Sequence, residues 1–319
     1  TGQHYDDALS AQFFRDLSLP EANFNLNIGS GPHGLQTGRM LEGIENVLQQ
    51  VHPDLVITFG DTNSTLAGAL TASKLHIRTV HIEAGLRSFN RGMPEEINRV
   101  GADQFSDILF APTEIAMENL QVEGLGSRAH LTGDIMVDTL KDNLGRASER
   151  HDTLDMHDLN VGEYYLLTLH RPSNVDNPQT LEDILSQLNT LDYPVLFPLH
   201  PRTKKTLNSI DMDDRDNIHI TKPMGYLDFL SVQCHARKII TDSGGVQKEA
   251  YLLKKPCITL RTETEWVETV DAGWNVLLYP ERDDLAEAII RFNPTDEQVD
   301  IFGQSVAHKM VNIIHEILS

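Results

Sequence analysis

Short apolar segments rich in β-forming residues alternate with helical segments along most of this chain, and this alternation limits the folds open to it. The strand-like segments are 55–59, 78–82, 107–110, 164–169, 194–199, 238–241 and 257–260. Helical patterns lie between most of them, for example at 65–74, 181–191 and 246–253. Strands that alternate with helices in this way predict an α/β protein built from βαβ units and parallel sheets.

A polar stretch at 146–162, with few strand signals, separates two such series. A chain of 319 residues is long enough for two domains of ordinary size. We therefore expect two Rossmann-like parallel-sheet domains facing a central cleft. The first spans 1–158 and the second 159–302. A closing helix at 303–319 is expected to pack back on the first domain.

Composition narrows the function classes. The 47 acidic and 26 basic residues give a formal net charge of -21, which argues against non-specific nucleic-acid binding. No apolar run reaches the roughly 18 residues of a membrane span. The two cysteines cannot form a disulfide framework and match no zinc motif, so a cytoplasmic location is expected. The acidic, Lys-poor composition fits a salt-adapted protein or a merely acidic soluble one.

Polar residues follow the predicted strands. In open parallel sheets ligands bind beyond the carboxyl ends of the strands, so these residues are the candidate site. The first series supplies the carboxylates Asp61 and Glu83, each alternatively an ordinary helix-capping residue. The second series supplies His, Arg and a Gly-rich turn. They are His170-Arg171, His200-Pro201-Arg202, Asp242-Ser243-Gly244-Gly245 and Arg261. Acid/base groups are thus expected to oppose an anion site.

The turn Ser243-Gly244-Gly245 carries the clearest anion signal, because it leads from a strand into a helix. Glycines allow close backbone approach, and the N–H groups and dipole of a helix start favour phosphate. A tight turn capped by Ser243 is the competing interpretation. Glu249, further along the helix, is expected either to accept hydrogen bonds from a ribose diol or to lie on a solvated face.

Two further candidates have plain structural alternatives. Glu95 and Glu96 are adjacent on a predicted helix, where neighbouring side chains point about 100° apart, so at most one of them is expected to face the cleft. A charge that stabilises the helix start is the alternative for each. His170 lies at a strand end beside Arg171, and the alternative is one more structural or exposed histidine among 14. Neither His170 nor His200 belongs to a metal-ligand spacing.

The residues together resemble a known family, the non-hydrolysing UDP-N-acetylglucosamine 2-epimerases, which share the two-domain fold of GT-B glycosyltransferases. The matching motifs occur in family order along nearly the whole chain. They are 1–4 (TGQH), 60–62 (GDT), 81–87 (HIEAGLR), 94–99 (PEEINR), 111–114 (APTE), 132–134 (TGD), 170–172 (HRP), 200–202 (HPR), 241–250 (TDSGGVQKEA) and 260–268 (LRTETEWVE). The family's amino-terminal strand and Gly-Thr-Arg-Pro-Glu turn, with an Arg and a Lys of the nucleotide-sugar site, have no counterpart from Thr1 onward.

The resemblance implies a role for each candidate. Three essential carboxylates and a histidine near the pyrophosphate are expected to be catalytic: Asp61, Glu83, Glu95 and His170. The substrate-binding set is expected to contact phosphate, ribose and uracil. Its members are Ser243, Gly244, Gly245 and Arg261 in the phosphate region, Glu249 at the ribose, and Phe229 stacked on uracil. Without the resemblance, Phe229 reads as a core residue.

The implied activity is interconversion of UDP-GlcNAc and UDP-ManNAc. UDP leaves to give 2-acetamidoglucal and then adds back after proton transfer at C2. No metal and no other cofactor is implied. A homodimer and a role in cell-surface polysaccharide or glycan precursor synthesis are expected.

Three alternatives remain open at the level of sequence. A hydrolysing relative would release ManNAc and UDP after the same elimination. A GT-B glycosyltransferase would bind a UDP-sugar similarly but has no use for three carboxylates. A non-catalytic nucleotide-sugar-binding protein is the third, since the family's amino-terminal motif has no match. Gln3, His4 and His200 lie in motifs that contribute to a second, regulatory substrate site in some bacterial relatives.

Overall fold

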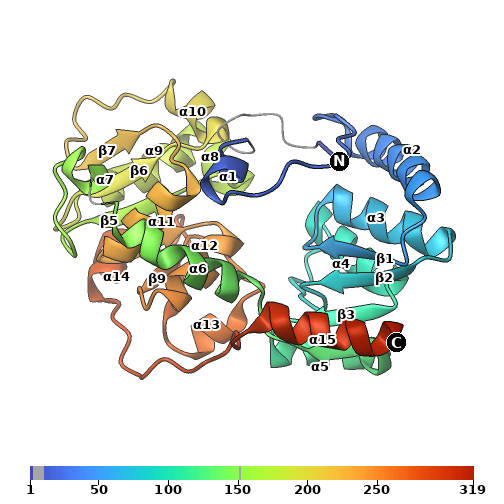
Figure 1. The fold of residues 1–319 in the computed structure, drawn as a ribbon. Helices are drawn as coiled ribbons and strands as arrows, with labels where there is room; N and C mark the ends of the chain where they lie inside the picture. Colours follow the sequence, from blue (N-terminus) through green and yellow to red (C-terminus); the bar gives the residue numbers. More distant parts are fainter. Residues whose placement is uncertain (3–10, 151) are drawn as a thin grey trace. The chain divides into compact units, whose positions relative to one another are not determined.

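The computed structural model describes residues 1–2, 11–150 and 152–319 (Figure 1). The chain divides into two compact units. The first comprises residues 1–139 and 300–319, and the second comprises residues 140–299. The division falls inside helix α6 (Met136–Ser148), which runs through it, whereas the polar stretch in the sequence places the boundary at 158/159.

The first unit contains a four-stranded parallel sheet with the strand order β1-β2-β3-β4. Its strands are β1 (Leu55–Phe59), β2 (Arg78–Ile82), β3 (Ile108–Ala111) and β4 (Ala129–Leu131). Its helices are α1 (Ala11–Asp16), α2 (His33–Val51), α3 (Asn63–Lys74), α4 (Pro94–Phe105), α5 (Glu114–Val122), the 3₁₀ turn η2 (Gly126–Arg128) and α15 (Val306–Leu318), with α6 beginning here.

The register of this sheet brings the carboxyl ends of its strands together. Phe59 pairs with Ile82, and Ile82 pairs with Phe110, so β1, β2 and β3 end at one edge. β1 is the outer strand, and its side chains Ile57 and Phe59 are 44% and 58% exposed. Residues that follow these strands are therefore close neighbours in space.

Helix α15 belongs to the first unit although it ends the described chain. Its buried side chains Val306 and Met310 pack against the β2 and β3 residues Val80, Ile82 and Phe110. The helix shows the apolar spacing that the sequence displays over its last residues, and burial of that face holds it on the sheet.

The second unit contains a six-stranded parallel sheet with the order β10-β9-β8-β5-β6-β7. Its strands are β5 (Tyr165–Thr168), β6 (Val195–Pro198), β7 (Ile218–Thr221), β8 (Lys238–Thr241), β9 (Cys257–Thr259) and β10 (Asn275–Leu277). Its helices are α7 (Asp152–Asp155), α8 (Pro172–Val175), α9 (Pro178–Leu188), α10 (Pro201–Leu207), α11 (Tyr226–His235), α12 (Gly244–Leu252), α13 (Val267–Asp271) and α14 (Leu285–Arg291).

This order is that of a Rossmann sheet, in which the strand order reverses between β5 and β8 while all strands stay parallel. A core of fully buried side chains lies on one face, for example Leu167 and Ile240 of the central strands against Leu181 and Leu185 of α9. The reversal point is where ligands bind in open α/β sheets, and here it is the space beyond Thr168 and Thr241.

The predicted α/β class with two parallel sheets is confirmed. Seven strands lie at or within a residue of the expected segments. The structure adds β4, β7 and β10, and all three are short strands at the outer edges of their sheets. Edge strands need less apolar sequence than central strands, so their signal is weak. Among the described residues, no helix is long and apolar enough to cross a membrane.

Candidate functional site

The first unit places Asp61 directly beyond the carboxyl end of β1. Its carboxylate Oδ2 accepts a hydrogen bond from Nη2 of Arg99 on α4, a guanidinium that is almost completely buried. The backbone carbonyl of Asp61 accepts a further hydrogen bond from Asn98 Nδ2 at 3.0 Å. With an exposed fraction of 31%, the Asp61 carboxylate is reachable from solvent yet held by a neighbouring element.

Glu83 lies at the matching position after β2, beside the turn that carries Asp61. Its φ of 69° is in the left-handed region, which a residue with a side chain adopts only where the surrounding structure fixes it. A Cβ built on Gly60, which itself has φ of 64°, would lie 3.3 Å from Oε2 of Glu83. The two loops are therefore in contact, and Asp61 and Glu83 lie on neighbouring turns.

The two glutamates at the start of α4 have separate surroundings. Glu96 is buried, and its carboxylate accepts hydrogen bonds from the backbone N–H groups of Ser88 and Phe89, both at 2.9 Å, and from the Ser88 hydroxyl at 3.0 Å. Glu95 is exposed. Glu96 thus closes the loop ahead of the helix, and Glu95 is left as the candidate that faces solvent.

In the second unit, His170 lies at the switch point between β5 and β8. Its ring nitrogen Nδ1 is 3.0 Å from Oδ1 of Asp242, which is fully buried. Asp242 also accepts from the N–H groups of His170 and Arg171 and from Asn174 Nδ2, at 2.9–3.1 Å. Burial by itself raises the pKa of Asp242, but these hydrogen bonds and His170 outweigh it and hold the pKa below its usual range.

The Gly-rich turn begins helix α12, with Ser243 at the N-cap. The Ser243 hydroxyl makes no capping hydrogen bond, so the capping interpretation is not the one the described chain adopts. A Cβ on Gly244 would meet Oε1 of Glu265 at 2.7 Å, whereas Gly245 has only the Ser243 hydroxyl at 4.0 Å. Small residues thus leave the N–H groups at the start of α12 accessible to an anion.

Arg261, which follows β9, adds positive charge to this region. Its side chain is 5% exposed, and Nη1 lies 2.9 Å from Oε2 of Glu265. In the part of the chain that is described, Nη1 and Nη2 of Arg261 have no hydrogen-bond partner of suitable geometry. Arg171 is 3.8 Å from Oε1 of the same glutamate. Two guanidinium groups that share one carboxylate leave a net positive charge here, which favours an anionic ligand.

Glu249 is buried within α12 and is not on a solvated face. Its Oε2 accepts a hydrogen bond from Gln233 Nε2 at 2.7 Å. Burial raises the pKa of Glu249, more than the hydrogen bonds from Gln233 and Tyr226 and the charge of Lys248 lower it. A buried carboxyl with polar neighbours on α11 and α12 is suited to accept hydrogen bonds from a diol.

The remaining candidates are placed less tightly. Phe229 on α11 is half-buried and packs against the core cluster that includes Tyr164 and Val232. His200 follows β6, and its ring centroid is 5.3 Å from that of His170. Gln3 and His4 lie outside the described residues.

Several contacts of the candidate residues could not be predicted from the sequence, although Asp242 itself is among the residues that follow a strand. Asp242 orients His170, Arg99 holds Asp61, and Gln233 contacts Glu249. The pairing of Thr168 with Thr241 is what brings Asp242 to His170, so the strand order, had it been known, would have identified it. Arg99 and Gln233 reach their partners from other helices, and spacing along the chain does not reveal such contacts.

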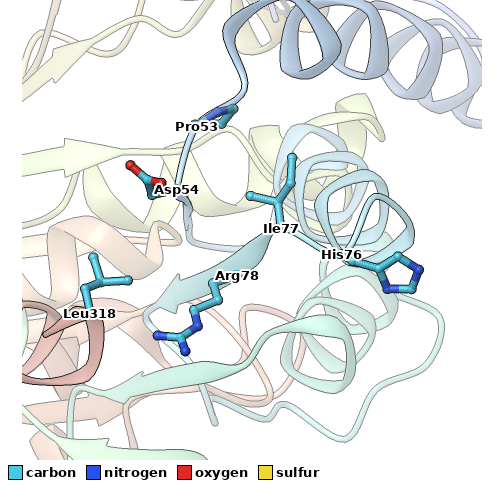
Figure 2. Close-up of a pocket in the computed structure, with 6 residues that line it drawn as sticks. All are labelled: Pro53, Asp54, His76, Ile77, Arg78 and Leu318. Carbon is cyan, nitrogen blue, oxygen red and sulfur yellow. The ribbon is translucent and has the colours of Figure 1, made fainter.

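A surface pocket of about 540 Å³ lies elsewhere in the first unit (Figure 2). It is lined by Pro53, Asp54, His76, Ile77, Arg78 and Leu318. Apart from Leu318, the last residue of α15, these residues precede or begin β1 and β2, so the pocket is at the amino ends of the strands and away from Asp61 and Glu83. Within residues 1–2, 11–150 and 152–319, no three His, Cys, Asp or Glu side chains are grouped to hold a metal ion.

Comparison with known proteins extends these observations. A family model described as UDP-N-acetylglucosamine 2-epimerase matches residues 1–315. The UDP-N-acetylglucosamine 2-epimerase of Methanocaldococcus jannaschii is 47% identical over 300 residues, covering 91% of this chain and 82% of that protein. A UDP-2,3-diacetamido-2,3-dideoxy-D-glucuronate 2-epimerase of Pseudomonas aeruginosa is 45% identical over 294 residues, covering 90% of this chain and 81% of that protein.

Among solved structures, a crystal structure of the M. jannaschii UDP-GlcNAc 2-epimerase in complex with UDP-GlcNAc and UDP matches with a TM-score of 0.91. The two sequences are 45% identical, and the match covers 98% of this chain and 90% of that one.

Proposed function

The chain belongs to the UDP-N-acetylglucosamine 2-epimerase family, and from this we propose that it interconverts UDP-GlcNAc and UDP-ManNAc without hydrolysis. The observation that carries the proposal is the 45% identity, over 98% of the chain, to an enzyme solved in complex with UDP-GlcNAc and UDP. The candidate residues supply the two kinds of group that the reaction needs, acid/base carboxylates and an anion site.

In this proposal the second unit binds UDP. The N–H groups at the start of α12, from Ser243 to Gly245, and the guanidinium of Arg261 bind the pyrophosphate. Glu249 accepts hydrogen bonds from the ribose, and Phe229 stacks on uracil. The Nδ1 proton of His170 is held by Asp242, which leaves Nε2 to contact the departing phosphate oxygen.

The chemistry begins with loss of UDP, because the C2 hydrogen of the sugar has no adjacent carbonyl and is not acidic. The anomeric C1–O bond breaks, and its electron pair leaves with the UDP oxygen. Positive charge at C1 makes the C2 proton removable, a carboxylate takes it, and a C1–C2 double bond forms. A proton then adds to the opposite face of C2, and the UDP oxygen bonds to C1 again. No electrons are gained or lost overall.

Inversion at C2 requires an acid/base group on each face of the sugar, and we assign these roles to Asp61 and Glu95. Glu83, whose loop contacts that of Asp61, stabilises the positive charge that develops at C1. General acid/base groups of this kind are each worth about 10²–10⁴ in rate.

A second candidate substrate is a UDP-2,3-diacetamido-2,3-dideoxyglucuronate. The P. aeruginosa relative named for that substrate is 45% identical, as near to this chain as the M. jannaschii enzyme in the solved complex. The same elimination at C1 and C2 serves both sugars. They differ at C3 and at the C6 carboxylate, so the choice depends on cations near C6.

Three further features follow from the family resemblance. We propose that the protein is a homodimer, that it acts in the cytoplasm, and that its product is a precursor of a cell-surface polysaccharide or glycan. Sedimentation equilibrium tests the first of these directly.

Proton NMR of the protein with UDP-GlcNAc in deuterated water tests the activity. We expect UDP-ManNAc carrying deuterium at C2. Free ManNAc with UDP would assign the hydrolysing reaction instead. UDP binding without turnover would indicate a non-catalytic binding protein, and turnover of the diacetamidoglucuronate alone would select the second candidate.

A further inference from the structure

A fully buried histidine connects the two loops that carry the carboxylates Asp61 and Glu83. His81 lies on β2, and both His81 and its neighbour Asp103 on α4 have no exposed surface. Nδ1 of His81 is 2.6 Å from Oδ1 of Asp103, and Nε2 is 2.7 Å from the backbone carbonyl oxygen of Gly60. Both ring nitrogens are therefore in hydrogen-bond contact.

Both of these partners are acceptors. A carbonyl oxygen can only accept, and Asp103 is surrounded by donors. Its Oδ2 accepts from Gly85 N–H at 3.1 Å and lies 2.8 Å from Nη2 of Arg87. A neutral imidazole has one N–H, which would leave a ring lone pair facing an oxygen lone pair at under 2.8 Å. Two donated hydrogen bonds require a proton on each nitrogen.

We propose that His81 is held as a buried imidazolium, and that the His81–Asp103 ion pair positions two of the catalytic carboxylates, Asp61 and Glu83. Asp61 is positioned through the contact between His81 and the Gly60 carbonyl, because this carbonyl belongs to the peptide bond that joins Gly60 to Asp61. Fixing that carbonyl fixes the plane from which the Asp61 side chain extends.

Glu83 is positioned through the hydrogen bond that the Gly85 N–H donates to Asp103. Gly85 ends the turn that holds Glu83 in its left-handed conformation, and a Cβ on Gly85 would lie 2.2 Å from the carbonyl of Ala116, so the turn has no room to shift. One buried pair thus holds the loops after β1 and β2 at once.

The charges behind the pair are balanced. Arg87 donates to both carboxylate oxygens of Glu123, the residue that follows α5, at 2.7 and 2.6 Å, besides its contact with Asp103. His81 and Arg87 carry two positive charges, and Asp103 and Glu123 two negative charges. Without the His81 proton, Asp103 and Glu123 would share the single charge of Arg87. Of these two carboxylates only Glu123, whose side chain is 28% exposed, is in contact with water, so a charge left on Asp103 would be costly.

Neutron diffraction from crystals of the wild-type protein tests the charge directly, and it requires no variant. We expect deuterons on both Nδ1 and Nε2 of His81 at neutral pH. A single deuteron would overturn the assignment. In Asp103→Asn, where an amide replaces the carboxylate, we expect one deuteron, on Nε2.

Kinetics test the positioning role, which rests on the proposed epimerase activity. In His81→Gln we expect kcat to fall about 10²-fold, the scale of a small misplacement of catalytic groups. UDP affinity, measured by calorimetry, is expected to stay at the wild-type value because the proposed UDP contacts are in the second unit. His130→Gln, on the outer strand β4 of the same sheet, is the matched control and should keep the wild-type kcat.

The outcomes separate the two proposals. A wild-type protein that does not turn over either nucleotide sugar refutes the proposed function, while the neutron result still decides the charge of His81. An active wild type with an unchanged kcat in His81→Gln refutes the positioning role. Equal losses of UDP binding and kcat in that variant also refute it, because they indicate a general structural role.

Discussion

Replacing Asp242 by Asn tests the assignment of His170 most sharply, because the change alters one buried atom. The carboxylate of Asp242 has five donor contacts at 2.9–3.1 Å from His170, Arg171 and Asn174. In the variant, the amide nitrogen takes the place of Oδ1 and faces Nδ1 of His170. The remaining oxygen keeps the contacts from Arg171 and Asn174.

This arrangement limits the loss of stability. The charge-assisted hydrogen bond that Nδ1 of His170 donates to Asp242 is lost, and the remaining hydrogen bonds to residue 242 then go to a neutral amide. Together these changes cost about 1–3 kcal/mol in free energy of unfolding. The pKa of Asp242 is lowered in the folded protein, so its contribution is complete above the ordinary Asp value near pH 4 and is lost as the pH falls through the folded value. The wild type and the variant should therefore converge in stability in strong acid.

The effect on catalysis is larger. An amide N–H that points at Nδ1 makes that nitrogen an acceptor and moves the single proton of His170 to Nε2. The imidazolium is disfavoured because its Nδ1–H would face another donor. The neutral ring can still donate Nε2–H to the departing phosphate oxygen, but it lacks the positive charge of the imidazolium. We therefore expect kcat to fall by about 10²–10³, the scale of one lost oxyanion donor.

The assay is the rate of UDP-ManNAc formation, followed by NMR, with thermal and denaturant unfolding measured in parallel. Asp183→Asn on α9 is the matched control, because Asp183 is exposed and accepts a hydrogen bond from the exposed side chain of Gln179. Wild-type kcat in Asp242→Asn would refute the reasoning, whatever the change in stability.

Three other substitutions give separate expectations. Asp61→Asn should lower kcat by about 10²–10⁴ and leave UDP affinity unchanged, as calorimetry would show. Glu249→Gln should weaken UDP binding about tenfold, or 1.4 kcal/mol. The wild type should lose stability as the pH rises above about 4.3, because the folded pKa of Glu249 is raised and the folded protein favours the protonated carboxyl. Glu249→Gln has no ionisable group at this position and should not show this loss. Gly244→Ala should destabilise the protein by about 1–2 kcal/mol and weaken UDP binding, since its Cβ meets the buried carboxylate of Glu265. Gly245→Ala has open space and is the stability control, and equal melting temperatures for the two variants would contradict the steric argument.

The central strands could be predicted from the sequence because they are buried on both faces and read as short apolar runs. β2 and β8 begin and end where the pattern places them. β1 does so too, although it is an outer strand with exposed side chains, because its segment is rich in β-forming residues. The outer strands β4 and β10 are three residues long, and β4 is only partly buried, so neither has a pattern to detect. The position of a strand in the sheet, which is a tertiary property, influences whether the strand can be predicted from the sequence.

For the candidate site, the sequence predicted which residues lie at strand ends but not which side chains contact them. Strand ends identify Asp61, Glu83, His170 and the start of α12, since parallel strands end at a common edge. The contacts of these residues could not be found this way, even where the partner, such as Asp242, is itself a strand-end residue. Asp242 is adjacent to His170 only because β8 pairs with β5, more than 70 residues away in sequence.

The contrast between Asp61 and Glu95 illustrates what the buried partners contribute. Asp61 is fixed through the guanidinium of Arg99, and Asn98 binds its backbone carbonyl, so its orientation is set before any ligand binds. Glu95 is exposed at the first turn of α4, while its neighbour Glu96 takes the buried contacts that close the preceding loop. If both carboxylates act on C2, they do so with unequal preorganisation, and the two directions of the reaction depend differently on substrate binding. The face of C2 served by Asp61 is the one that the folded chain prepares in advance.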